Sequence, residues 1–284
     1  MLGRDIVVHV AESVLDPDLG DHVCLPFEDE RERMAATRAF TVNGLRRRSL
    51  VLIVTHADSP ERTRDWLAPL VPGFTEAFSA GQVEILASAE THFTGGAFDP
   101  ARVYAGLAEA GDRARRHGRR GVYALVDASW GVGDVPGHAA FEAAANKLFG
   151  ERWLAAVCQY DRRLFARDDL ERAASVHPIA PEQALLRFAD TGSPRGLRVW
   201  GDVDLTNRPA FASLLERLEK EPGEVVIDAS ELDFIDAGSA QLLTRTAMAR
   251  PRGATVVVCR GRVARVLRLI RADEFVAVRR VDDV

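Results

Sequence analysis

Val225-Val226-Ile227-Asp228, Leu232-Asp233-Phe234-Ile235 and then Asp236-Ala237-Gly238-Ser239 make up the most informative part of the 284-residue chain. The apolar residues of the first two segments are typical of a buried strand. Residues 237–249, which follow, have the apolar spacing of a helix. The stretch therefore predicts a strand, a sharp loop around Asp236 and a helix that begins at Ala237.

Strands and helices alternate on both sides of this loop. We expect strands at 197–205, 224–228, 255–259 and 275–281, and helices at 208–220, 237–249 and 262–270. About 85 residues in this order make a compact α/β unit.

The N-terminal part has a similar alternation on a larger scale. Apolar runs at 22–27, 50–55, 83–86, 122–127 and 154–159 predict strands, and amphipathic segments at 30–44, 60–70, 100–117 and 137–149 predict helices. Strands that are apolar throughout are typical of a parallel sheet covered by helices on both faces. We therefore expect a doubly wound α/β domain over residues 1–185.

Prolines and glycines then indicate a linker at 186–195, and the second domain takes residues 196–284.

Composition excludes several classes of protein. A net charge of −5 and a pI near 5.9 provide no field that attracts nucleic acid. No apolar run approaches the roughly 20 residues that cross a bilayer, and residues 1–5 lack the pattern of a secretion signal. The three cysteines are an odd number without CxxC spacing, so we expect reduced thiols and a cytoplasmic protein without membrane contact.

Ligands of parallel sheets bind beyond the carboxyl ends of the strands, where residues 24–28, 56–59, 127–133 and 159–162 should meet. Residues 25–30 contain no glycine, lysine or hydroxyl but three carboxylates, which excludes ATP hydrolysis by a phosphate loop. Trp130 offers either a flat face to an organic ligand or a side chain packed beneath its own loop. The candidate ligand-binding residues are His22, Cys24, Phe27, His56, Asp127, Trp130, Gln159 and Tyr160. For Asp127 we favour an N-cap or turn role.

Four soft or borderline ligands are candidates for a metal site. His22 and Cys24 lie two apart on one strand and so face the same side, Cys158 lies on another strand, and His177 follows a helix. Such residues hold zinc or a haem iron when the fold brings them together. The alternative is that they are ordinary buried core residues. Because no CxxC or HExxH pattern is present, we expect no cofactor.

Five short motifs together resemble the MEDS domain, the sensory domain described in methanogens, methylotrophs and a dichloromethane-responsive regulator. They are Asp21-His22-Val23-Cys24, Phe40-Thr41-Val42-Asn43-Gly44-Leu45, Ser129-Trp130, Cys158-Gln159-Tyr160-Asp161 and His177-Pro178. The resemblance covers about residues 10–180. It implies a RecA-like core without a phosphate loop, and sensing of a small ligand rather than catalysis.

Residues 196–281 resemble the STAS domain of bacterial anti-sigma factor antagonists. The matching motifs are Gly201-Asp202-Val203-Asp204-Leu205, Val226-Ile227-Asp228-Ala229-Ser230 and Phe234 to Ser239. In that family the loop aspartate is typically followed by serine or threonine residues, one of which the partner anti-sigma kinase phosphorylates. Ala237 and Gly238 occupy those positions here and have no hydroxyl to modify. Ser239 and Ser230 remain as displaced candidate acceptors.

These resemblances imply a sensor-controlled antagonist of an anti-sigma factor of the histidine-kinase-like ATPase class. The implied partner contact comprises Asp204, Leu205, Phe234, Asp236, Ala237, Gly238 and Ser239. One alternative is a ligand-, metal- or haem-binding scaffold whose STAS unit forms a homodimer or joins a larger signalling complex. The other is an enzyme that uses a strand-end cluster of His22, His56 and Asp161, although the sequence has no GxSxG elbow.

Overall fold

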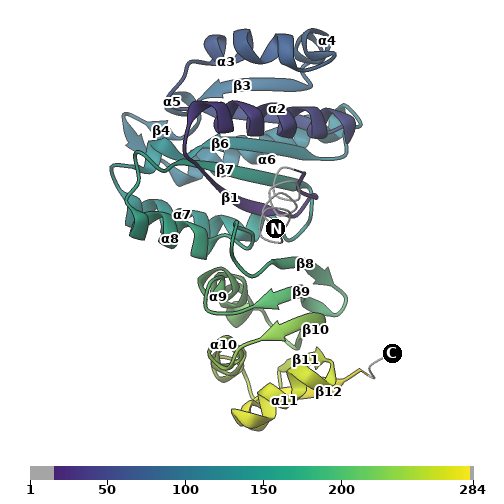
Figure 1. Ribbon diagram of the computed structural model, residues 1–284. Helices are drawn as coiled ribbons and strands as arrows, with labels where there is room; N and C mark the ends of the chain where they lie inside the picture. The colour runs from purple at the N-terminus through teal and green to yellow at the C-terminus, as the bar shows by residue number, and fades with distance from the viewer. Residues whose placement is uncertain (1–15, 282–284) are drawn as a thin grey trace, which may run out of the picture. The chain divides into compact units, whose positions relative to one another are not determined.

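The computed structural model describes residues 16–281, which form two α/β units, each built on one five-stranded sheet (Figure 1). The predicted fold class is confirmed for both units.

The first sheet is entirely parallel and has the strand order β1-β7-β6-β2-β3. Its strands are β1 (His22–Phe27), β2 (Leu50–Thr55), β3 (Val83–Ala87), β6 (Val122–Asp127) and β7 (Leu154–Asp161). Every residue of β2 and β7 is buried, as expected for strands with helices on both faces.

The helices that precede β8 (Leu186–Gly192) are α2 (Glu30–Arg46), α3 (Pro60–Leu67), α4 (Phe74–Ser79), α5 (Ser88–Thr91), α6 (Pro100–Arg116), α7 (Val135–Ala145) and α8 (Arg167–Val176). Helices α2, α3, α6 and α7 follow the four predicted segments, α8 is the helix expected before His177, and the short helices α4 and α5 were not predicted. The side chain of Asp29 caps α2 by accepting a hydrogen bond from the backbone N–H of Glu32 at 2.9 Å. The acidic run before α2 therefore has the structural role that the helix dipole favours. A short hairpin of β4 (Phe93–Thr94) and β5 (Ala97–Phe98), not predicted, precedes α6.

The second sheet has the order β12-β11-β10-β9-β8, in which only β8 runs antiparallel to its neighbour. Its strands are β8 (Leu186–Gly192), β9 (Arg195–Val203), β10 (Val225–Ile235), β11 (Thr255–Cys259) and β12 (Ala277–Arg280). The helices of this unit are α9 (Arg208–Glu216), α10 (Ala237–Met248) and α11 (Gly261–Leu269).

The structure places strand β8 and the start of β9 where the sequence indicated a linker at 186–195. Leu186 and Phe188 are buried, whereas Arg187 and Ala189 between and after them are half-buried. This alternation belongs to an antiparallel edge strand with one face on the core, and Gly192 to Arg195 form the hairpin turn. The linker interpretation of these residues was therefore wrong.

Strand β10 is also longer than predicted, because it continues from Asp228 to Ile235. Its pairing with β9 shifts register twice, between Asp228 and Glu231 and between Leu232 and Phe234. Such bulges interrupt the apolar pattern of a strand without ending it. As a result, the paired ends of β9 and β10 lie side by side just before the Asp236 loop.

Candidate functional site

The carboxyl ends of the parallel strands in the first sheet meet at one edge, as predicted. Phe27 pairs with Asp161, and Asp127 pairs with Gln159. The Asp127 carboxylate accepts hydrogen bonds from the backbone N–H groups of His56 at 3.2 Å and Ala57 at 2.8 Å, and from that of Ser129 at 3.0 Å. Asp127 thus joins two strand ends, which is the turn role favoured from the sequence.

Trp130 lies in an aromatic cluster. Phe98 stacks on its ring at 4.4 Å between centroids, and the rings of His138 and His92 lie at 4.2 and 5.1 Å. A ring covered in this way gains packing energy from its neighbours. The structure therefore favours the packed alternative for Trp130 over a ligand platform.

The other predicted edge residues differ in accessibility. Gln159 is buried, and its amide nitrogen lies 3.4 Å from both the Arg33 carbonyl and the Thr37 hydroxyl. Tyr160 is buried with its hydroxyl 3.5 Å from Nε2 of His138, and Phe27 is also in the core. His56 is exposed, with its Nδ1 2.7 Å from the hydroxyl oxygen of Ser88.

His22 does not lie at this edge. It is the first residue of β1 and pairs with Ala156 near the start of β7, whereas Asp161 is the last residue of β7. The predicted strand-end cluster of His22, His56 and Asp161 was therefore wrong. His22 lies at the amino end of its strand, whereas His56 and Asp161 lie at the carboxyl ends of theirs.

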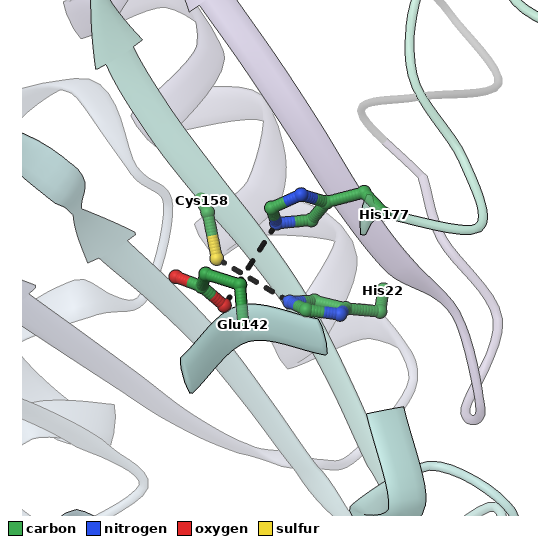
Figure 2. A group of neighbouring side chains, drawn as sticks. All are labelled: His22, Glu142, Cys158 and His177. Carbon is green, nitrogen blue, oxygen red and sulfur yellow. Dashed lines mark hydrogen bonds and ion pairs between the residues drawn. The ribbon is translucent and has the colours of Figure 1, made fainter. Parts of the chain in front are cut away.

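His22 instead belongs to a buried group that also contains Glu142, Cys158 and His177 (Figure 2). One ligand atom from each residue lies within 4.8 Å of the ligand atoms of all the others. Nε2 of His22 lies 3.6 Å from Sγ of Cys158, and Nε2 of His177 lies 3.9 Å from a carboxylate oxygen of Glu142. The structure thus brings together three of the four residues predicted as metal candidates.

The fourth candidate, Cys24, is not a member of this group. Glu142 takes its place, and it was not predicted because it has no recognisable spacing to the histidines or to Cys158. Its one local signal is a carboxylate on the alanine-rich helix α7, among residues typical of a buried face.

In the second sheet, Asp236 organises the loop before α10. One carboxylate oxygen accepts a hydrogen bond from the backbone N–H of Ser239 at 2.6 Å, which caps the helix, and the other accepts from the Arg208 guanidinium at 2.6 Å. Burial raises the pKa of this carboxyl, but the bonds from Ser239 and Arg208 outweigh burial and lower it overall.

Ser239 is unsuited to be a phosphate acceptor in this conformation. Its side chain is fully buried, and its hydroxyl accepts a hydrogen bond from Nε of Arg208 at 3.2 Å. Ser230 is half-buried and its backbone N–H bonds the Asp228 carboxylate. Ala237, in contrast, is exposed at the first position of α10.

Two large apolar side chains are exposed at the same edge of the second sheet. Leu205 is 70 % exposed and Phe234 is 52 % exposed. Leu205 follows β9, and Phe234 is near the end of β10. These two strands are paired as far as their last residues, since Val203 pairs with Ile235 and the backbone N–H of Asp236 donates a hydrogen bond to the Val203 carbonyl. Asp204 shapes the neighbouring turn by accepting from the Thr206 N–H at 2.8 Å.

Asp236→Ala is expected to lower the free energy of unfolding by about 1 to 2 kcal/mol at pH 7, because it removes the helix cap and the partner of Arg208. Urea unfolding of both proteins measures this. Because folding lowers the pKa of Asp236, its contribution is present above the ordinary value of about 3.9 and is lost as the pH falls through the folded-state value. An unchanged unfolding free energy at pH 7 would show that the cap contributes nothing.

Comparison with known families identifies two regions. A family model described as the MEthanogen/methylotroph, DcmR Sensory domain (MEDS) matches residues 21–178, and one described as the Mlab, STAS domain matches residues 186–278. A search of curated proteins finds no match. Among solved structures, the flagellar accessory protein FlaH from Methanocaldococcus jannaschii is similar at 9% identity, with a TM-score of 0.41, over 74% of this chain and 88% of that one. Both matched families are sensory or regulatory types rather than enzyme families.

Within residues 16–281, no helix has the length and apolar character that crossing a membrane requires.

Proposed function

The chain belongs to the MEDS sensory family and carries a STAS domain behind the sensory domain, and we propose that it is a sensor-controlled antagonist of an anti-sigma factor. The partner in this proposal is an anti-sigma factor of the histidine-kinase-like ATPase class, bound by the edge of the STAS sheet. Regulatory proteins are the general partners of STAS domains, and the anti-sigma class is the specific part of the proposal.

The observation that carries the proposal is the exposure of Leu205 and Phe234 beside the start of α10. Large apolar side chains that water surrounds in the free protein gain free energy when a partner covers them. Aromatic residues in particular provide much of the energy of protein interfaces. We name Leu205, Phe234 and Ala237 the STAS edge surface.

Control by phosphorylation does not suit this surface. Ala237 and Gly238 have no hydroxyl, and the Ser239 hydroxyl is buried against Arg208. In the proposal, control belongs to the sensory domain, whose ligand shifts the protein between two arrangements. A ligand does so only if it binds the two arrangements with different affinities. A small organic molecule or a metal ion could serve as that ligand.

A second candidate function is a metal-binding sensor within a signalling complex that contains no sigma factor. The buried group of His22, Glu142, Cys158 and His177 favours it.

Phe234→Ala is expected to weaken the complex with the anti-sigma partner by about 30-fold, because truncating an aromatic anchor costs about 2 kcal/mol or more. Isothermal titration of the purified chain with the anti-sigma kinases of its own genome measures the affinity.

Phe275→Ala is the matched control, since Phe275 is 44 % exposed and follows the last helix of the second unit rather than β10. This control should bind like the wild type. Equal weakening by both variants, or by neither, would contradict the assigned surface. Absence of any complex with these kinases would favour the second candidate function.

A further inference from the structure

We propose that His22, Glu142, Cys158 and His177 bind one zinc ion in a closed, four-ligand site inside the sensory domain (Figure 2). All four residues lie within the stretch that the sensory family model matches. They come from β1, α7, β7 and the segment that follows α8.

The chemistry of the four donors suits zinc. Two imidazole nitrogens, one thiolate sulfur and one carboxylate oxygen are the ligand types that Zn²⁺ takes in proteins. Magnesium and calcium prefer sites made of oxygen atoms only, which this group does not provide. The combination of sulfur with imidazole instead indicates a borderline transition metal.

The distances between donors also suit a tetrahedral ion. Bonds of about 2.0–2.3 Å at tetrahedral angles separate neighbouring donor atoms by about 3.4–3.6 Å. The His22 to Cys158 distance is 3.6 Å and the His177 to Glu142 distance is 3.9 Å. The widest separation in the group is within 4.8 Å, so modest movement of the side chains completes the site.

A second contact orients one of the imidazoles. Nδ1 of His177 lies 2.7 Å from the carbonyl oxygen of Ala173. A carbonyl can only accept, so Nδ1 carries the hydrogen and donates it, and in the neutral ring Nε2 then holds the lone pair. This nitrogen is the one that approaches Glu142. Metal-bound histidines are commonly fixed in this way through their other nitrogen.

A divalent ion also suits the charge that these donors would carry once they bind it. Glu142 is 4 % exposed, and the other three residues are at most 3 % exposed. An ionised carboxylate and a thiolate are costly to bury unless positive charge compensates them. One Zn²⁺ neutralises both, so that the complete site with two neutral imidazoles carries no net charge.

Four protein donors leave no open position for water or substrate, which is the pattern of a structural rather than a catalytic zinc site. Four donors that surround one point also leave no plane for a porphyrin, whose iron takes its protein ligands along the ring axis. The geometry therefore points to a bound ion and not to the haem alternative.

Zinc at this position would link strands β1 and β7 with helix α7 and with the segment that follows α8. Metal loading would then stabilise the domain, because an ion that binds only the folded state adds to its stability. The site does not depend on the proposed anti-sigma partner, and it can be tested in the chain alone.

The test begins with the full chain purified without chelators. Elemental analysis should find about one zinc per chain. After removal of the metal, titration with Co²⁺ should produce the ligand-field bands of a tetrahedral ion and a thiolate charge-transfer band, both saturating at one equivalent.

Cys158→Ser should lose the charge-transfer band and bind Zn²⁺ at least about 100-fold more weakly. Mutation of a residue that only hydrogen-bonds to a metal ligand already lowers metal affinity by about 10- to 100-fold, and Cys158 would be a ligand itself. Cys24→Ser is the matched control, because Cys24 is also a buried thiol and pairs with Cys158 in the sheet but lies outside the group. It should retain the band and the affinity.

Glu142→Gln provides a second variant in case Cys158→Ser fails to fold, since it keeps the size of the side chain and removes its charge. Zinc should raise the melting temperature of the metal-free wild type and of Cys24→Ser, but not that of Glu142→Gln. The proposal is overturned if the metal-free wild type gives no tetrahedral cobalt spectrum, or if either ligand variant binds zinc as tightly as the wild type.

Discussion

Ala237→Asp is expected to weaken binding to the anti-sigma partner by at least about 100-fold. Ala237 is exposed at the first position of α10, in the STAS edge surface. A carboxylate there would lose its water when the partner docks, and an unpaired charge in an interface costs about 2 to 5 kcal/mol. The variant should fold normally, because an acidic residue in the first turn of a helix is stabilising. Titration calorimetry measures the loss, and circular dichroism checks the fold.

Ala277→Asp is the control for this experiment. It makes the same substitution at an exposed alanine of the edge strand β12, away from the Asp236 loop. Its affinity should equal that of the wild type. If Ala237→Asp also binds like the wild type, α10 does not begin inside the interface and the assignment of the partner site is wrong.

Ala237→Ser is expected to create a phosphate acceptor at this loop, so that the variant takes about one phosphate per molecule more than the unaltered chain. The new hydroxyl would be exposed, and the backbone amides at the start of α10 favour a phosphate group. The phosphate would carry a charge of about −1.5 to −2 into the interface and so release the partner. Intact-mass spectrometry after incubation with the kinase, Mg²⁺ and ATP measures the modification.

Gly238→Ser should be a poorer acceptor. A Cβ at this position would lie 2.6 Å from the Arg208 guanidinium, so that the arginine must move away from Asp236. Phosphate transfer to neither variant would count against docking of a kinase at this loop.

Most of the fold was predictable because apolar runs mark buried parallel strands. Strands β2 and β6 begin and end at the predicted residues for this reason. Strand β8 was missed because its side chains alternate and a glycine and a proline follow it, which resembles a linker in composition. The alternation of Leu186 and Phe188 was the signal that could have identified it.

The candidate metal group was predictable only in part. His22, Cys158 and His177 were identified by residue type, but nothing local in the sequence places Glu142 beside them. Contacts between residues about 120 positions apart depend on strand order, and an order in which β1 lies beside β7 cannot be read from spacing. His22 was assigned to the wrong end of the sheet for a different reason, because it is the first residue of the predicted strand at 22–27 and so lies at the amino end, whereas His56 follows the carboxyl end of β2.

The STAS edge surface was predicted from its motif, and the structure adds the reason why Ser239 is a poor acceptor. Its position three residues after Asp236 places its backbone N–H in the helix cap, and Arg208 from α9 covers its hydroxyl. That arginine is about 30 positions away in the chain, so the motif alone did not reveal it.

The most direct test of partner binding without phosphorylation is a titration of the unaltered chain with the proposed anti-sigma kinase partner, with and without ATP and Mg²⁺, followed by intact-mass spectrometry. We expect equal affinity in the two conditions and an unchanged mass. Stoichiometric phosphate on the STAS domain, with loss of the complex when ATP is present, would contradict partner binding of this kind.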